Sequence, residues 1–270
     1  MSPTYEPVTD PTQLLASFGV SLPDAAEAAP PWAGAGLVAP FIVRAGAAPA
    51  QARLGLHGLL PHFAGDIGMA RQGSHCRVET MKSQPTFRES WWSGRRCVVP
   101  VQWIAEWRHE SGRPELCHIQ HADDEPLRVA GLWNDWPGPG GDPVPTFALL
   151  TVKADGHEVF GRMGAPDHEK RMPAILPASS QDLWLLGSLK DAERLLARYP
   201  AAQLQVTSTA PLFKAPREPS SWALSLDMFA PEWHALAAEP QPPRRRRARP
   251  PRAVPPPAPE RAAPTTGDLF

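Results

Sequence analysis

Cysteine is scarce in this chain, with three residues among 270. An odd and small number of cysteines excludes a disulfide scaffold and fits a reducing compartment. No run approaches the roughly 20 apolar residues of a membrane-spanning helix. The first residues, MSPTYEPVTD, lack the basic region and apolar run of a secretory signal. The sequence therefore predicts a cytoplasmic protein without a membrane partner.

The common sequence motifs for cofactors are also missing. There is no GxxxxGK[ST], no GxGxxG after a strand and no HExxH. Cys117, His118 and His121 are close in sequence, but alternation along a strand would place His118 on the face opposite the other two. We therefore expect neither a metal nor a cofactor.

Proline is abundant, with 35 residues. From residue 240 to the end there are ten prolines and seven arginines but only two acidic residues, so a basic arm follows a slightly acidic body. The arm lacks aliphatic periodicity and cannot offset the entropy of folding. We expect a domain over residues 1–235 and a disordered tail over residues 236–270.

Most body segments are typical of short strands bounded by Gly, Pro or Asp. The predicted strands are 41–45, 95–107, 115–122, 127–136, 146–152 and 202–209. Helices are predicted after Asp10, which would cap a helix beginning at Pro11 with an apolar face of Leu14, Leu15 and Phe18, and over 83–92, 182–186 and 191–199. Because no βαβ rhythm appears, we expect an α+β fold, mainly antiparallel β, with a barrel-like core and peripheral helices.

Five blocks in order carry a family resemblance. They are RLGLHGLLPHFAGDI (53–67), HCRVETMKSQPTFRESWWSGRRCVVPVQWIAEW (75–107), EPLRVAGLW (125–133), TFALLTVKADGH (146–157) and DHEKRMPAILP (167–177). Together they resemble the SOS-response-associated peptidase (SRAP) family of abasic-site processing proteins. The resemblance covers roughly residues 1–230.

The resemblance implies a defined chemistry at the N-terminus. Removal of Met1 would expose residue 2, whose α-amine attacks the aldehyde of an abasic deoxyribose to form a Schiff base. In the family this residue is cysteine, and its thiol closes a thiazolidine that holds protein and DNA together. An asparagine, a glutamate and a histidine move protons, and arginines hold the flanking phosphates.

This chain departs from the family pattern at several of those positions. Ser2 replaces the cysteine, and His75 replaces the asparagine, whereas the glutamate is retained as Glu106. The family's histidine position is Gly164, and His168 lies four residues further on. The resemblance makes Ser2, His75, Glu106 and His168 the candidate catalytic residues, although Glu106 could instead be a satisfied edge carboxylate.

Three residues are candidates for nucleic-acid binding. Arg77 and Arg171 match family arginines, and they either hold phosphates or form structural ion pairs with Glu79 or Glu169. Phe63 occupies a position where the family often presents an aromatic ring to DNA, so it could stack on an unpaired base.

Three functions follow from these residues. The first, which we favour, is a monomeric, nucleoid-associated protein that binds single-stranded or abasic DNA with lost or reduced crosslinking and autopeptidase activity. The second is an active enzyme that uses the Ser2 α-amine with a substitute histidine. The third is a non-catalytic repair adaptor acting through its tail. The final residues Asp268, Leu269 and Phe270 resemble the peptide by which bacterial repair proteins dock on the replication sliding clamp.

Overall fold

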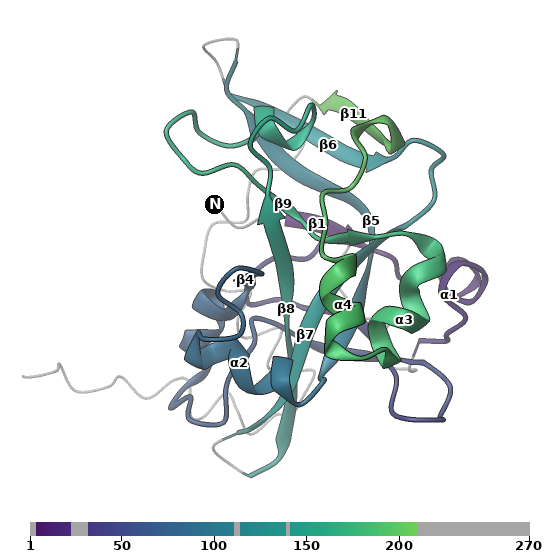
Figure 1. The fold of residues 1–270 in the computed structure, drawn as a ribbon, viewed down its shortest axis with the longest axis vertical. Coiled ribbons are helices and arrows are strands. Elements are labelled where there is room, and N and C mark those ends of the chain that lie inside the picture. Colours follow the sequence, from purple (N-terminus) through teal and green to yellow (C-terminus); the bar gives the residue numbers. More distant parts are fainter. Residues whose placement is uncertain (1–3, 23–31, 111–113, 139–140, 210–270) are drawn as a thin grey trace, which may run out of the picture.

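The computed structural model describes residues 4–22, 32–110, 114–138 and 141–209 (Figure 1). The strands of this part of the chain form one sheet of eleven strands. In chain order the strands are β1 (Thr4–Pro7), β2 (Val38–Val43), β3 (Gln51–His57), β4 (His75–Arg77), β5 (Arg96–Arg108), β6 (Glu115–His121), β7 (Leu127–Pro137), β8 (Pro143–Lys153), β9 (Arg171–Pro173), β10 (Ile175–Leu176) and β11 (Leu204–Thr209).

Five strands close into a barrel. The order β7-β8-β3-β2-β5 returns to its start because β5 also pairs with β7. These contacts are antiparallel except for β3 with β8, where Leu56 lies opposite Thr146 in a parallel register. Strands β6 and β11 extend the sheet beyond β5, at the top of Figure 1. The barrel encloses a core of aliphatic and aromatic side chains in which Phe41 and Phe147 stack with ring centroids 5.2 Å apart.

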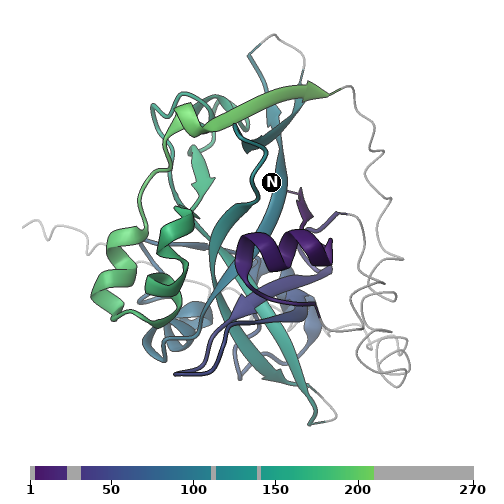
Figure 2. The same ribbon diagram turned by 90° about the vertical axis from the view of Figure 1, so that its right-hand side faces the viewer.

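Helices surround this barrel. They are α1 (Pro11–Phe18), α2 (Pro85–Trp92), α3 (Gln181–Leu186) and α4 (Leu189–Leu195), with short 3-10 turns at Ile67–Gly73, Phe160–Arg162, Ala178–Ser180 and Ala201–Gln203. Helix α2 packs on β7, and α3 packs on β5. Figure 2 shows β11 crossing the top of the molecule above α1 and the α3–α4 pair. The fully buried Trp184 of α3 donates its indole N–H to the Cys97 carbonyl at 2.8 Å, which anchors this helix to the barrel.

The predicted α+β class with a barrel-like core is confirmed, and so is the helix after Asp10. The Asp10 carboxylate accepts from the Gln13 backbone N–H at 2.7 Å, and Pro11 occupies the first turn. The apolar face of this helix consists of Leu14 and Phe18, whereas Leu15 is exposed. The expectation that Leu15 also faces the core was therefore wrong.

Element ends differ where local hydrogen bonds compete with the predicted pattern. The second helix begins at Pro85 rather than residue 83, because the Ser83 hydroxyl donates to the Thr80 carbonyl and does not cap the helix. The last helix ends at Leu195 rather than residue 199, and Tyr199 is buried instead.

The predicted tail and the clamp-like peptide lie outside the described residues, as does Ser2. Among the described residues, no helix is both long and apolar enough to cross a membrane.

Candidate functional site

The long strand β5 carries Glu106 near its end. β1 pairs with this part of β5, so that Thr4 lies opposite Ala105, directly next to Glu106. On its other side Glu106 lies opposite Cys117 of β6. Burial raises the pKa of the Glu106 carboxyl to about 7. A carboxyl that titrates near neutral pH can both donate and accept a proton, which is the requirement for a general acid or base.

Glu106 lines a cavity of about 100 Å³. The other lining residues come from the segment that follows β8: Met163, Gly164, Ala165, His168, Glu169 and Arg171. The structure therefore brings together three of the residues expected from the sequence, namely Glu106, His168 and Arg171. His75 is not among the residues that line this cavity.

Two sets of hydrogen bonds hold the loop that carries Gly164 and His168, one from the backbone and one from a lysine side chain. The Gly164 N–H donates to the Trp107 carbonyl at 2.6 Å, which ties the loop to β5 one residue beyond Glu106. The Lys170 ammonium donates to three successive carbonyls, those of Met163, Gly164 and Ala165, at 2.8, 3.1 and 2.9 Å. Sequence reasoning missed Lys170, since nothing in the local pattern distinguishes it from an exposed lysine.

Gly164 occupies a special backbone position within this loop. Its φ is +72°, in the left-handed region that glycine adopts without a penalty. A Cβ built there would meet no atom within 4 Å, so the space beside it is open. The position that the family resemblance assigns to a histidine is thus a turn glycine facing open space.

His75 begins β4, and its imidazole is buried against two neighbours. The Ser74 hydroxyl donates to the Arg71 carbonyl at 3.0 Å, so it accepts from His75 Nδ1 at 3.0 Å. This leaves a lone pair on His75 Nε2, a buried atom with no partner among the described residues. Burial lowers the pKa of His75 to about 3, helped by the nearby His57, so the ring is neutral at physiological pH.

His57 lies beside His75, with ring centroids 5.4 Å apart. Its Nε2–H donates to the Ser74 carbonyl at 3.0 Å, and burial lowers its pKa to about 4. Tyr5 of β1 contacts the other side of His57, at 5.6 Å between centroids. The Tyr5 hydroxyl is also buried without a partner in the described part of the chain. Sequence reasoning did not identify this polar cluster, because Tyr5, His57 and His75 lie far apart in the sequence and meet only in the folded chain.

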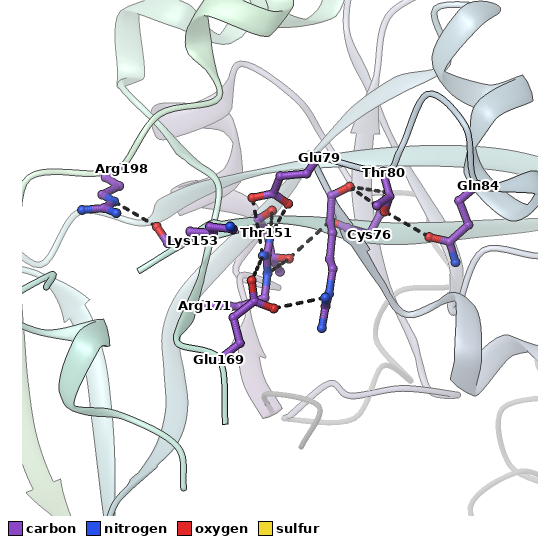
Figure 3. A network of polar contacts seen from close by, with 10 residues as sticks. Cys76, Glu79, Thr80, Gln84, Thr151, Lys153, Glu169, Arg171 and Arg198 are labelled. Carbon is purple, nitrogen blue, oxygen red and sulfur yellow. Dashed lines mark hydrogen bonds and ion pairs between the residues drawn. The ribbon is translucent and has the colours of Figure 1, made fainter. Parts of the chain in front are cut away.

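Arg77 and Arg171 meet at one carboxylate. Glu169 accepts from Arg77 Nη1 and from Arg171 Nη1, each at 3.1 Å. Figure 3 shows Glu169 beside Arg171. Arg171 also donates to the Glu79 carboxylate at 2.8 Å and to the hydroxyl and carbonyl of Thr151 at 3.0 and 2.6 Å. Its side chain is 15% exposed, whereas that of Arg77 is 59% exposed. The ion-pair alternative therefore describes Arg171 well, and only Arg77 presents a largely exposed guanidinium.

Phe63 follows β3 and is 53% exposed. Its ring contacts His62 edge-on at 5.4 Å, and His62 Nδ1 lies 2.7 Å from the Glu89 carboxylate of α2. The contact with Glu89 holds His62 in place and leaves the ring of Phe63 accessible. Within the described ranges, no three His, Cys, Asp or Glu side chains gather in a way that could hold a metal ion.

Comparisons with known proteins agree with one another. The family model of SOS response associated peptidases matches residues 4–213. The abasic site processing protein YoqW of Bacillus subtilis is 27% identical over 167 residues, covering 60% of this chain and 71% of that protein. The abasic site processing protein HMCES of Gallus gallus is 29% identical over 132 residues, covering 42% of this chain and 37% of that protein.

Solved structures show the same relationship. A protein from Bordetella bronchiseptica superposes with a TM-score of 0.71 at 26% identity, covering 77% of this chain and 99% of that one. A protein from Bacteroides thetaiotaomicron shares the fold, with a TM-score of 0.65 at 22% identity, covering 81% and 97% of the two chains. The family match covers well over half of the sequence. This chain therefore belongs to the SOS response associated peptidase (SRAP) family.

Proposed function

We propose that this protein binds single-stranded DNA at abasic sites and forms at most a reversible Schiff base there. Its relatives are abasic site processing proteins, which supports DNA with an abasic site as the substrate. The observation that carries the proposal is Glu106, a half-buried carboxyl with a pKa of about 7 that lines a cavity. Such a group can move the protons that imine formation requires at neutral pH.

The proposed chemistry begins with the α-amine of Ser2 after removal of Met1. The amine attacks the aldehyde of the opened deoxyribose, and loss of water gives an imine. In the family a thiol then adds to the imine carbon. The Ser2 hydroxyl is a much weaker nucleophile than a thiol, whose pKa is near 8.5. The imine should therefore remain open to hydrolysis, which regenerates the aldehyde and the free amine.

One observation favours a second candidate, an active enzyme with a substitute histidine. His168 lines the same cavity as Glu106, although it lies four residues beyond the position expected from the family. If His168 takes over the proton transfers of the missing histidine, turnover would continue without a stable adduct. Ser2, His168 and Glu106 would then act together.

The tail offers a third, non-catalytic contribution at the nucleoid. The run of four arginines from Arg244 to Arg247 would stay near phosphate, and the ending Asp268-Leu269-Phe270 would dock on the sliding clamp. Deleting Leu269 and Phe270 should abolish binding of the full chain to purified clamp and leave its DNA affinity unchanged. Clamp binding that survives this deletion would contradict the tether.

A trapping experiment tests the main proposal. The full-length protein is incubated with a single-stranded oligonucleotide carrying one abasic site, with and without borohydride, and resolved on a denaturing gel. Borohydride reduces an imine to a stable secondary amine, so a covalent band is expected only with the reductant. A heat-stable band without borohydride would contradict the loss of the stable crosslink.

Two variants assign the residues in the same assay. Glu106→Gln should reduce trapping strongly, and His168→Gln should reduce it only if the second candidate is correct. Glu158→Gln, at an exposed residue after β8, provides a matched control. The absence of any band, together with unchanged binding to abasic and intact oligonucleotides, would contradict chemistry at Ser2 and favour the adaptor.

A further inference from the structure

A second cavity lies at the other end of the β5–β6 pair from Glu106. Its volume is about 420 Å³, within the range of pockets that hold small organic ligands, roughly 300–1,000 Å³. The loop between β6 and β7, strand β10 and the segment around Tyr199 surround it. None of the described residues that line it also lines the Glu106 cavity.

The main charged group of this cavity is Arg128 on β7. Arg128 is only 8% exposed, and its guanidinium lies 4.7 Å from the centre of the Phe18 ring. Nη2 donates to the Ser17 carbonyl and Nη1 lies 3.5 Å from the Pro126 carbonyl, but Nε is buried without a partner. No carboxylate of the described residues forms an ion pair with Arg128. A buried cation that contacts only neutral groups is unfavourable unless an anion joins it.

Other groups in the cavity complement Arg128. The Asp123 backbone N–H donates to His121 Nδ1 at 3.2 Å, so neutral His121 carries its proton on Nε2 and can donate it to a ligand. The Tyr199 ring lies 6.3 Å from His121. Leu127 and Ile175, which are 1% and 2% exposed, supply apolar walls. The cavity can thus accommodate a ligand that has a polar end and an apolar body.

Glu125 limits the charge that this cavity can accept. It is an exposed lining residue, and its carboxylate interacts favourably with Arg128 from beyond ion-pair distance. A dianion such as a phosphate ester would be repelled by Glu125 more strongly than a monoanion. The charge balance therefore favours a single carboxylate.

We propose that this cavity binds a small organic monocarboxylate, with the carboxylate against Arg128 and the apolar body between Leu127 and Ile175. The geometry resembles that of other small-molecule sites, in which apolar walls surround a few convergent polar groups. The site is independent of the proposed reaction on DNA, because it uses different residues.

Calorimetric titration of the full-length protein with 2-naphthoate tests the proposal. We expect a dissociation constant of about 1 mM or below, and no measurable binding of the neutral analogue 2-naphthamide. Arg128→Met keeps much of the side-chain volume, and it should weaken binding about tenfold or more, because it removes the charged hydrogen-bond donor. Arg194→Met, an exposed arginine on α4, is the matched control and should bind like the unaltered protein.

A second variant keeps the test decisive if Arg128→Met fails to fold. Ala178 is an exposed lining residue, so Ala178→Phe should close the cavity without touching Arg128. Loss of naphthoate binding in this variant supports the location. Unchanged binding in Ala178→Phe, equal binding of 2-naphthamide, or no binding to the unaltered protein would overturn the proposal. Tighter binding of 2-naphthyl phosphate than of 2-naphthoate would overturn the assignment to a monocarboxylate.

Discussion

His75 Nδ1 lies 3.0 Å from the Ser74 hydroxyl oxygen, and this contact determines which nitrogen of the imidazole carries the proton. The Ser74 hydroxyl hydrogen is already donated to the Arg71 carbonyl, so the hydroxyl can only accept from His75. Where the family resemblance places an asparagine, this chain thus presents a neutral ring with a free lone pair. An asparagine amide could donate a hydrogen bond there, whereas His75 Nε2 can only accept one.

The buried state of His75 predicts an acid-sensitive fold. Its pKa is about 3 in the native protein, compared with an ordinary value near 6.5. Between these values the unfolded chain binds a proton that the native protein does not, so stability falls as the pH falls through this window. His75→Asn should remove part of this loss of folding stability at low pH, up to about 2 kcal/mol at pH 5.

Urea unfolding at pH 7.5 and pH 5.0 measures this effect. The difference between variant and unaltered protein at pH 7.5 reflects packing alone, since both states then hold neutral rings. A difference that is the same at both pH values would show that His75 is protonated in the native protein at pH 5.

Glu106 predicts the opposite pH dependence. Burial raises its pKa from an ordinary 4.5 to about 7, so between these values the native protein holds a proton that the unfolded chain has lost. Stability therefore falls as the pH rises from about 4.5 to 7 and is constant above. Glu106→Gln should stabilise the protein more at pH 8 than at pH 5, by up to about 3 kcal/mol. Thermal unfolding at the two pH values checks this, and an equal shift at both would mean that the carboxyl is ionised throughout.

The two arginines of the shared ion pair should behave differently. Arg77→Ala should weaken binding of a single-stranded oligonucleotide and reduce the salt dependence by about one counterion, because this guanidinium is exposed. Its effect on stability should stay within about 0.5 kcal/mol. Arg171→Ala should instead destabilise the fold by roughly 2 kcal/mol, since Glu79 loses the guanidinium that pairs with it and Thr151 loses two hydrogen bonds.

Fluorescence anisotropy over a series of salt concentrations, combined with urea unfolding, separates these effects. Arg88→Ala on α2 is a control for the loss of an exposed arginine. Unchanged affinity of Arg77→Ala at low salt would contradict a phosphate contact.

Lys170 should hold the loop beside Glu106 in its observed conformation. Lys170→Met removes the donors to three successive carbonyls and should release the segment from Met163 to Ala165. Hydrogen exchange of the Gly164 amide should accelerate about tenfold or more, since this amide is bonded to Trp107 only while the loop is held. Lys190→Met is the matched control on α4. Unchanged exchange at Gly164 would show that the turn itself holds the loop.

The elements predicted well were those with local causes. The Asp10 cap and the proline after it define α1, and alternation or continuous apolar runs define the long strands. The strand Gln51–His57 was not predicted, because Gly55 and His57 interrupt the usual strand composition. Gly55 is needed there: a Cβ would approach the Phe41 ring at 2.5 Å, and that ring belongs to the neighbouring strand.

In the candidate site, too, the sequence identified individual residues but not the contacts between distant segments. The family resemblance identified Glu106 and His168, which line one cavity, but it could not decide between a phosphate contact and an ion pair for Arg171. That choice depends on Thr151 and Glu79, which lie far from it in sequence. Ser74 and Lys170 act through contacts that no spacing rule encodes.

The parallel pairing of β3 with β8 has a consequence for synthesis on the ribosome. The β2–β3 hairpin is complete early, but its free edge is covered only when Leu56 meets Thr146. Until then one edge of β3 has no strand paired with it, and such an edge is a template for association with other chains. The barrel should therefore close late and slowly, and the protein should depend on chaperones during translation more than its finished stability suggests.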